Sequence, residues 1–292
     1  METCAKTTGT LYVCATPIGN LEDITLRVLR ILRRVDLIAA EDTRKTAILL
    51  ARYRIRTPMI SCHQHNEASR TPYLLTLLRQ GKDVALLSEA GTPGISDPGE
   101  KVIGVAIKAG IPVVALPGPV ALITALVLSG LPTRRFVFEG FLPRQAAARR
   151  HRLEELAEEE RTMVFYEAPH RLQDTLGEMC AFFGDREAAV ARELTKLHEE
   201  VRRGTLKQLW EEFGREVPRG EMVIVVAGRR KISGVAPERL LGEVSELERQ
   251  GWRRSHAVRQ VARAYGVPRS ELYRAVLEKE AVPGKGPPVG KN

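Results

Sequence analysis

The stretch SEAGTPGISDPG, residues 88–99, indicates more about the fold of this chain than any other segment. It follows VALL at 84–87, a short apolar run that predicts a buried strand. Three glycines and two prolines in twelve residues exclude the interior of a helix or strand. A tight turn needs only four residues, whereas a long loop after a parallel strand is a typical ligand site in open α/β sheets.

The same alternation runs through the first half of the chain. Apolar runs predict strands at 11–15, 35–39, 59–62, 84–87 and 112–116, and helices are predicted at 22–34, 43–53, 67–80, 98–109 and 120–129. Strands that alternate with helices predict a parallel sheet with right-handed crossovers. The loops after these strands converge on one sheet edge, where we expect a small-molecule site.

The whole chain is predicted to hold two α/β domains and a small helical segment. We expect an N-terminal domain with a parallel sheet at 10–132, a second domain with a mixed sheet at 133–229, a basic helical domain at 236–280 and a disordered tail at 281–292. Two α/β domains joined by a short link enclose a cleft, which is a common place for a ligand.

The segment 258–272 predicts a helix-turn-helix. Ala262 is small where two helices would cross, Gly266 follows the first helix, and Arg269 or Ser270 begins the second. A small packing bundle with a basic face is the alternative interpretation of the same pattern.

Positive charge is concentrated near the C-terminus. Residues 229–292 hold 14 Lys and Arg against 7 Asp and Glu, whereas residues 1–228 hold 31 against 29. Such an excess indicates a polyanionic partner, with nucleic acid as the leading candidate. A solvated basic surface without a partner is the alternative.

The composition excludes several classes of protein. A hydrophobic content of 43% supports a folded core, and no apolar run approaches the ~18 residues of a membrane span. The N-terminus lacks an apolar secretory segment, and the four cysteines show neither metal-ligand spacing nor a disulfide framework. We therefore expect a cytoplasmic protein without membrane contact.

Common nucleotide and metal motifs are missing or weak. No Gly-x-Gly-x-x-Gly follows a strand and no P-loop occurs, so the usual dinucleotide fold is poorly supported. The segment HQHNE at 63–67 could place two imidazoles on one face of an extended chain, but no further ligand cluster accompanies it. We expect no metal, and RNA contact or hydrogen bonding within the loop is the better interpretation.

The loops resemble a known superfamily. TPIGN at 16–20, AEDTR at 40–44, SEAGTPGISDPG at 88–99 and PGPVALITAL at 117–126 resemble the tetrapyrrole methylases. A further set is similar to the family of bacterial 16S ribosomal RNA cytidine 2′-O-methyltransferases within it: FEGFLPR at 138–144, FYEAPHR at 165–171, ARELTK at 191–196 and GEMVIVV at 220–226. The resemblance covers about residues 10–228, and the basic helical segment matches a C-terminal appendage of that family less specifically.

The resemblance implies a function. It implies S-adenosylmethionine as methyl donor in the cleft, and 2′-O-methylation of a cytidine in the decoding region of 16S rRNA within the small ribosomal subunit. It also implies a homodimer. One departure is Glu89, where the family usually has Asp and the side chain is therefore one methylene longer. Two alternatives are a small-molecule tetrapyrrole methylase and a DNA-binding regulator that uses 258–274.

The resemblance and the positions of the loops indicate candidate site residues. Methyl transfer to a ribose hydroxyl needs alignment and benefits from a base, for which Glu167 and Glu41 are favoured over Asp42, Glu89, Glu139 and Glu193. The cofactor-binding candidates are Pro17, Gly91, Thr92, Ile95, Val120, Ala121 and Tyr166. The RNA-binding candidates are Arg44, Arg171, Arg192, Lys196, Arg259 and Arg263. For each charged residue the alternative is a helix cap or an ion pair with a neighbour.

Overall fold

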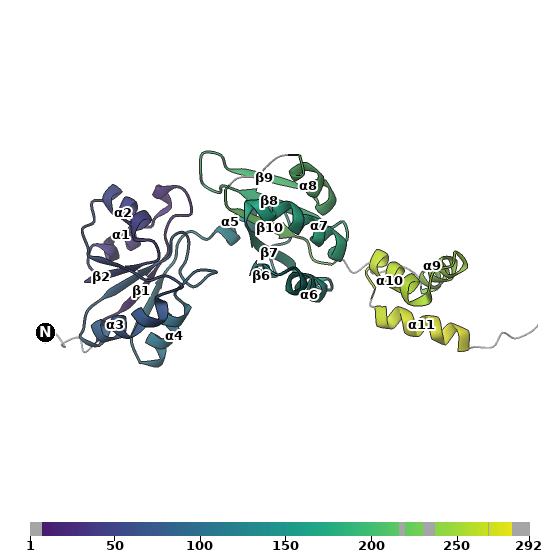
Figure 1. Cartoon of the computed structure of the whole chain (residues 1–292), viewed down its shortest axis with the longest axis horizontal. Coiled ribbons are helices and arrows are strands. Elements are labelled where there is room, and N and C mark those ends of the chain that lie inside the picture. The colour runs from purple at the N-terminus through teal and green to yellow at the C-terminus, as the bar shows by residue number, and fades with distance from the viewer. Residues whose placement is uncertain (1–7, 216–219, 230–236, 268, 282–292) are drawn as a thin grey trace, which may run out of the picture.

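The first half of the chain forms a parallel α/β unit (Figure 1). The computed structural model describes residues 8–215, 220–229, 237–267 and 269–281. Its first sheet has the order β3-β2-β4-β1-β5, and all neighbouring strands are parallel. The strands are β1 (Leu11–Cys14), β2 (Leu37–Ala40), β3 (Met59–Ser61), β4 (Val84–Leu87) and β5 (Val113–Leu116). The predicted parallel sheet is thus confirmed.

Helices cover both faces of the first sheet. Along β4, Ala85 and Leu87 pack on the side of α1 (Leu26–Leu32) and α2 (Thr43–Arg52), whereas Val84 and Leu86 pack on the other side. The helices on that other side are α3 (Glu67–Arg79) and α4 (Glu100–Lys108). Because successive side chains of a strand point to opposite faces, a strand buried on both sides must be apolar throughout.

The prediction of one continuous helix over 22–34 is wrong at its start. A short 3-10 helix, η1 (Leu21–Asp23), comes first, and Ile24 then has extended backbone angles. The hydroxyl of Thr25 accepts a hydrogen bond from the Val28 N–H and so begins α1. A threonine N-cap competes with the continuous helix that the apolar spacing suggests.

The second sheet is mixed, as predicted, with the order β6-β7-β10-β8-β9. β6 (Phe136–Phe141) is parallel to β7 (Thr162–Glu167), and the other pairs are antiparallel. The remaining strands are β8 (Glu187–Arg192), β9 (Glu200–Thr205) and β10 (Met222–Val226). α6 (Ala146–Leu156), α7 (Leu172–Phe183) and α8 (Leu206–Phe213) cover one face around a core that includes Phe165.

The other face of the second sheet is covered by α5 (Ala121–Ser129). Leu122, Ala125 and Leu126 of this helix pack with Val164 and Val223. We expect this helix within the N-terminal domain at 10–132, whereas its packing joins it to the second sheet. The chain therefore crosses from the first sheet to the second at residues 117–119, directly beside the predicted ligand loops.

Three C-terminal helices form a small separate bundle, the C-terminal helical unit. They are α9 (Pro237–Arg249), α10 (Arg254–Tyr265) and α11 (Arg269–Ala281), and they share a core with Val244, Val258, Val261 and Leu272. Gly266 ends α10 with a left-handed backbone, as the helix-turn-helix pattern predicts. Residues 282–292 of the predicted tail lie outside the described residues.

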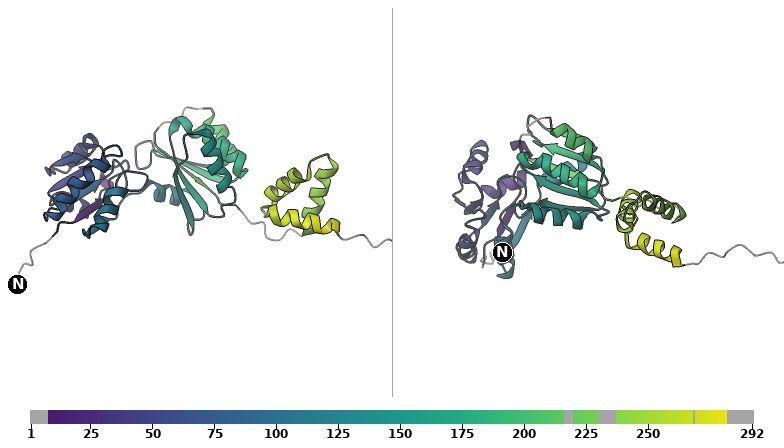
Figure 2. Two further views of the ribbon diagram at one scale, coloured as in Figure 1. Left: turned by 60° about the horizontal axis from the view of Figure 1, so that its bottom comes forward. Right: turned by 45° about the vertical axis from the view of Figure 1, so that its right-hand side comes forward.

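Figure 2 shows the same order from two further directions: the second sheet and its helices lie between the first unit and the C-terminal helical unit. No helix in the described part of the chain is long and apolar enough to span a membrane.

Candidate functional site

The loops after β1 and β4 are joined at the carboxyl edge of the first sheet. Thr16 and Gly91 exchange backbone hydrogen bonds of 2.8 and 3.0 Å. Gly91 has φ +79° and Gly99 has φ +131°, conformations that disfavour a side chain. The glycines therefore allow the 88–99 loop to fold back beside the strand ends and to present its backbone to a ligand.

A cavity of about 290 Å³, here called the cleft, lies against these loops. That volume is near the lower end of the roughly 300–1,000 Å³ of ligand pockets. Both α/β units contribute to its walls. Six of the predicted cofactor-binding residues line it, namely Gly91, Thr92, Ile95, Val120, Ala121 and Tyr166. Pro17 is not among the lining residues, although its neighbour Ile18 is.

A loop of the second unit reaches across to the first. The Asn20 N–H donates a hydrogen bond of 2.9 Å to the Thr195 hydroxyl. Glu193 and Thr195 have φ values of +51° and +64°, which non-glycine residues rarely adopt. Strain of this kind persists where the surrounding structure imposes it and is typical of functional sites. This contact joins the two α/β units next to Leu194 and Lys196, which line the cleft.

Asp97 is the cleft residue whose acidity is most clearly changed. Burial raises the pKa of its carboxyl group to about 7, and the negative charges of Glu41, Glu89 and Glu221 act in the same direction. The Asp97 side chain therefore changes charge near neutral pH. A carboxylate poised in this way beside a cavity is a candidate partner for a cationic ligand.

Glu167 lies at the end of β7, lines the cleft and is only 2% exposed. One carboxylate oxygen accepts the Ala168 N–H at 2.8 Å, and the other accepts the Thr175 hydroxyl at 2.7 Å. The guanidinium of Arg171 lies 3.5 Å away. These contacts hold the turn between β7 and α7, so Glu167 positions the wall of the cleft.

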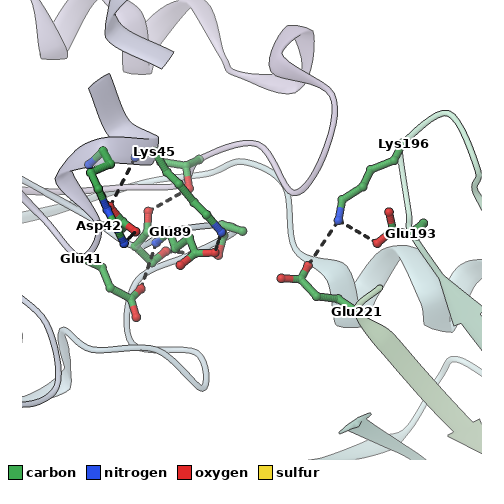
Figure 3. Close-up of polar contacts among 11 residues, drawn as sticks. Glu41, Asp42, Lys45, Glu89, Glu193, Lys196 and Glu221 are labelled. Carbon is green, nitrogen blue, oxygen red and sulfur yellow. Dashed lines mark hydrogen bonds and ion pairs between the residues drawn. The ribbon is translucent and has the colours of Figure 1, made fainter. Parts of the chain in front are cut away.

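The other favoured carboxylate, Glu41, lies on the first unit and is not among the residues that line the cleft. It accepts the Glu89 N–H at 2.9 Å and so ties the loop after β2 to the loop after β4 (Figure 3). The Glu89 carboxylate in turn pairs with the ammonium group of Lys45 on α2. Glu89 is one methylene longer than the Asp expected at this position, and its side chain extends toward the Lys45 ammonium group.

We predict that Glu89→Asp has a small effect. The shorter side chain should lose the Lys45 contact, but both side chains are partly exposed, and such pairs contribute roughly 0–1 kcal/mol. Urea unfolding should show a loss below about 1 kcal/mol. Activity assays should show kcat/KM close to that of the parent. A large loss of kcat/KM with unchanged stability would instead show that Glu89 takes part in the reaction.

The second α/β unit carries an ion cluster in its wall of the cleft (Figure 3). The Lys196 ammonium lies 2.9 Å from Glu193 and 3.8 Å from Glu221. The hydrogen bond from Lys196 lowers the pKa of Glu193. All three side chains line the cleft, so its walls are rich in carboxylates and suit a ligand that carries positive charge.

Most of the predicted RNA-binding side chains already have partners. Arg192 pairs with Glu200, Arg171 donates to the Leu142 carbonyl, and Arg263 donates to the Ala181 carbonyl. Arg44 pairs with Asp42 at 3.0 Å, which lowers the pKa of Asp42 to about 2, but its side chain is 90% exposed.

Glu67, the last residue of the 63–67 segment, stabilises the 88–99 loop. The buried Glu67 carboxylate accepts hydrogen bonds from the Gly99 and Val102 N–H groups, at 3.0 and 3.3 Å. It therefore holds the end of the 88–99 loop and the start of α4. This agrees with the interpretation of the segment as hydrogen bonding within loops.

The prediction missed several cleft residues, of which Asp97 matters most. Asp97 lies inside the quoted SEAGTPGISDPG segment, so position in a ligand loop was an available signal. Phe141, Met222 and Val223 also line the cleft, on β6 and β10. They belong to apolar strand patterns, which carry no sign of a ligand.

Comparison with known proteins gives consistent results. The model of the tetrapyrrole (corrin/porphyrin) methylases matches residues 10–210. A ribosomal RNA small subunit methyltransferase I of Synechocystis sp. is 49% identical over 276 residues, covering 94% of this chain and 99% of the relative. One from Pseudomonas aeruginosa is 46% identical over 278 residues, covering 93% and 98%.

Solved structures share the fold. A uroporphyrin-III C-methyltransferase of Thermus thermophilus, complexed with S-adenosylhomocysteine, is similar with a TM-score of 0.54 and 21% identity, covering 74% of this chain and 97% of that chain. A cobalt precorrin-4 methyltransferase has a TM-score of 0.55 and 17% identity, covering 75% and 94%.

Proposed function

Because this chain belongs to the tetrapyrrole methylase family, and within it to the ribosomal RNA small subunit methyltransferase I family, we propose that it methylates the ribose 2′-oxygen of a cytidine in 16S rRNA. It is an S-adenosylmethionine-dependent RNA methyltransferase by family. The observation that carries the site assignment is the carboxylate-rich cleft beside the loops after β1 and β4.

The residues of the cleft fit S-adenosylmethionine. Bound there, it would supply a methyl group activated by a positively charged sulfur. Gly91 and Thr92 place the 88–99 loop against the cleft, and Ile95, Val120 and Ala121 offer apolar contact. Burial raises the pKa of Tyr166 to about 12, so its hydroxyl stays protonated. These residues bind and orient, which is the main requirement of an in-line methyl transfer.

We assign Asp97 an electrostatic role in the cleft. Its ionised carboxylate is stabilised when a cation binds nearby, because opposite charges favour each other's charged form. The same burial that raises its pKa strengthens the attraction, since a low dielectric increases the interaction of charges.

Glu167 and Glu41 stay our proposals for the carboxylate near the ribose hydroxyl. Glu167→Gln preserves the size of the side chain, and its amide oxygen can still accept a hydrogen bond from Ala168 or Thr175. If Glu167 takes the proton, kcat should fall by about 10²–10⁴-fold with unchanged affinity for the methyl donor. If it only positions the β7–α7 turn, the loss should be accompanied by lower thermal stability. Glu41→Gln serves as the parallel variant.

The remaining parts of the proposal concern partners and place. The acceptor is the decoding region of 16S rRNA in the small subunit, the active form is a homodimer, and the enzyme works in the cytoplasm. The basic C-terminal residues support an RNA acceptor over a tetrapyrrole.

Labelled methyl donor tests the proposal directly. The protein is incubated with small ribosomal subunits that lack the modification, with free 16S rRNA and with a tetrapyrrole of the uroporphyrin type. We expect label in the subunit RNA and none in the tetrapyrrole. Label in the tetrapyrrole alone would overturn the RNA assignment.

A further inference from the structure

The C-terminal helical unit carries arginines that pair with acids and arginines that do not. On α9 and at the start of α10, Arg239, Arg249 and Arg254 lie beside Glu243, Glu246 and Glu248. In the part of the chain that the structure describes, Arg259 on α10 and Arg269 on α11 have no acidic partner. Both are exposed. The sequence of α10 contains Arg254, Arg259 and Arg263 and no Asp or Glu, so the uncompensated positive charge of this unit lies on α10, with Arg269 just after it at the start of α11.

Arg259 and Arg269 line a groove of about 1250 Å³ between the helical unit and the second α/β unit. The wall formed by α10 and α11 also carries Gln260 and Arg263, and among the described residues of these helices no Asp or Glu lines the groove. The acids of the groove, Glu154, Glu158, Asp185 and Glu187, belong to the opposite wall. That wall also carries Arg186 and Arg229, which offset part of its negative charge. An anion is therefore favoured along the helical wall, where the charged lining residues are all arginines.

Contacts from both sides fix the helical unit against the second α/β unit. Arg229, after β10, donates to the Val267 carbonyl at 2.7 Å and pairs with Glu158. Arg263, on α10, donates to the Cys180 and Ala181 carbonyls near the end of α7. The exposed carbonyls at a helix C-terminus attract a cation. These contacts join the helical unit to the second α/β unit from both sides.

The groove and the cleft lie at opposite ends of the same strands. Met222 at the start of β10 lines the cleft, whereas Ala227, just after its end, lines the groove. Likewise Glu187 begins β8 at the groove, and Glu193 follows that strand at the cleft. Five or six residues of strand span about 20 Å. The C-terminal helices accordingly lie on the far side of the second sheet from the first unit in both views of Figure 2.

We propose that Arg259 and Arg269 bind backbone phosphates of a second RNA segment of the small ribosomal subunit, at about 20 Å or more from the ribose in the cleft. This inference rests on the proposed function and adds a second contact to it. A short RNA that carries only the target nucleotide cannot reach both sites. The two contacts together therefore select a folded RNA or an assembled particle.

The test compares matched arginine variants on two substrates. Arg259→Ala and Arg269→Ala, singly and together, are compared with Arg249→Ala, which removes the same charge from an exposed position beside Glu246. Each is assayed with unmodified small ribosomal subunits and with a short single-stranded RNA that contains the target cytidine. Binding of each variant to the subunits is measured without methyl donor at several salt concentrations.

We expect the double variant to raise the KM for subunits by about ten-fold or more, and to reduce the slope of log affinity against log salt by about 2. Its kcat on the short RNA and its affinity for S-adenosylmethionine should be unchanged. Arg249→Ala should behave like the parent. Equal behaviour of the double variant and Arg249→Ala, in folded proteins with the same melting temperature, would overturn the inference.

The experiment distinguishes failure of this inference from failure of the proposed function. If the parent protein methylates no RNA, the function is contradicted, whereas subunit binding without donor still decides the role of Arg259 and Arg269. If both RNAs lose activity equally in the double variant, the arginines act on the cleft and the two-site inference is wrong.

Discussion

Replacement of Asp97 by asparagine is expected to weaken the binding of S-adenosylmethionine by about 10- to 100-fold and to reduce methyl transfer accordingly. The reason is the loss of a carboxylate that faces the cleft, where a cationic ligand would compensate its charge. Isothermal titration with the parent and the variant measures the change. Asp23→Asn, at an exposed position on η1, is the control.

The pH dependence of the two proteins should differ. Since the pKa of Asp97 is raised to about 7, donor affinity in the parent should rise between pH 6 and pH 8 as the carboxyl loses its proton. The variant has no such group, so its affinity should change little over that range. A parent profile that is flat between pH 6 and pH 8 would contradict the role of Asp97.

The same substitution should stabilise the protein without ligand at pH 8. Between the ordinary pKa of 3.8 and about 7, the folded state keeps a proton that the unfolded state has lost, so stability falls as pH rises through this window. Asparagine removes that penalty. The variant should therefore melt at a higher temperature than the parent at pH 8, and the difference should shrink toward pH 5.

Gly19→Ala is expected to reduce kcat/KM by about 100-fold, because a displacement of about 1 Å in a reacting geometry has effects of that order. A Cβ atom on Gly19 would lie 2.6 Å from the Thr195 hydroxyl oxygen and 2.7 Å from the Leu194 carbonyl oxygen. The carbonyl belongs to the backbone and cannot move freely. The two loops must therefore separate, and the hydrogen bond between Asn20 and Thr195 should be lost.

A matched control exists in α4. A Cβ on Gly104 would have no neighbour within 4 Å, so Gly104→Ala should stabilise that helix by up to about 1 kcal/mol and leave activity unchanged. Steady-state kinetics and thermal melting of both variants make the comparison. Full activity of Gly19→Ala would show that the contact between these loops does not shape the cleft.

Much of the architecture could be predicted from the sequence, because buried parallel strands leave a clear signal. The VALL run at 84–87 is apolar at every position since both faces of β4 are covered, and the glycine-rich loop after it could only lie at a sheet edge. Gly91, Thr92 and Tyr166, which the family resemblance implied as cofactor-binding residues, line one cavity, and their binding role stays a prediction.

What could not be predicted depends on contacts between distant segments. No local pattern indicates that α5 packs on the second sheet, because an apolar helix fits either sheet. The raised pKa of Asp97 arises from burial and from Glu41, more than fifty residues earlier in the chain. The Arg263 side chain resembles any exposed cation until the end of α7 is placed beside it.

The measurement that tests the central claim most directly is the chemical identity of the methylated product. Small ribosomal subunits that lack the modification are incubated with labelled S-adenosylmethionine and the protein, and the 16S rRNA is then digested to nucleosides. The account predicts label in 2′-O-methylcytidine and a strong loss of that label with Asp97→Asn. Label on a base, or no label in RNA from an enzyme that still binds the donor, would contradict it.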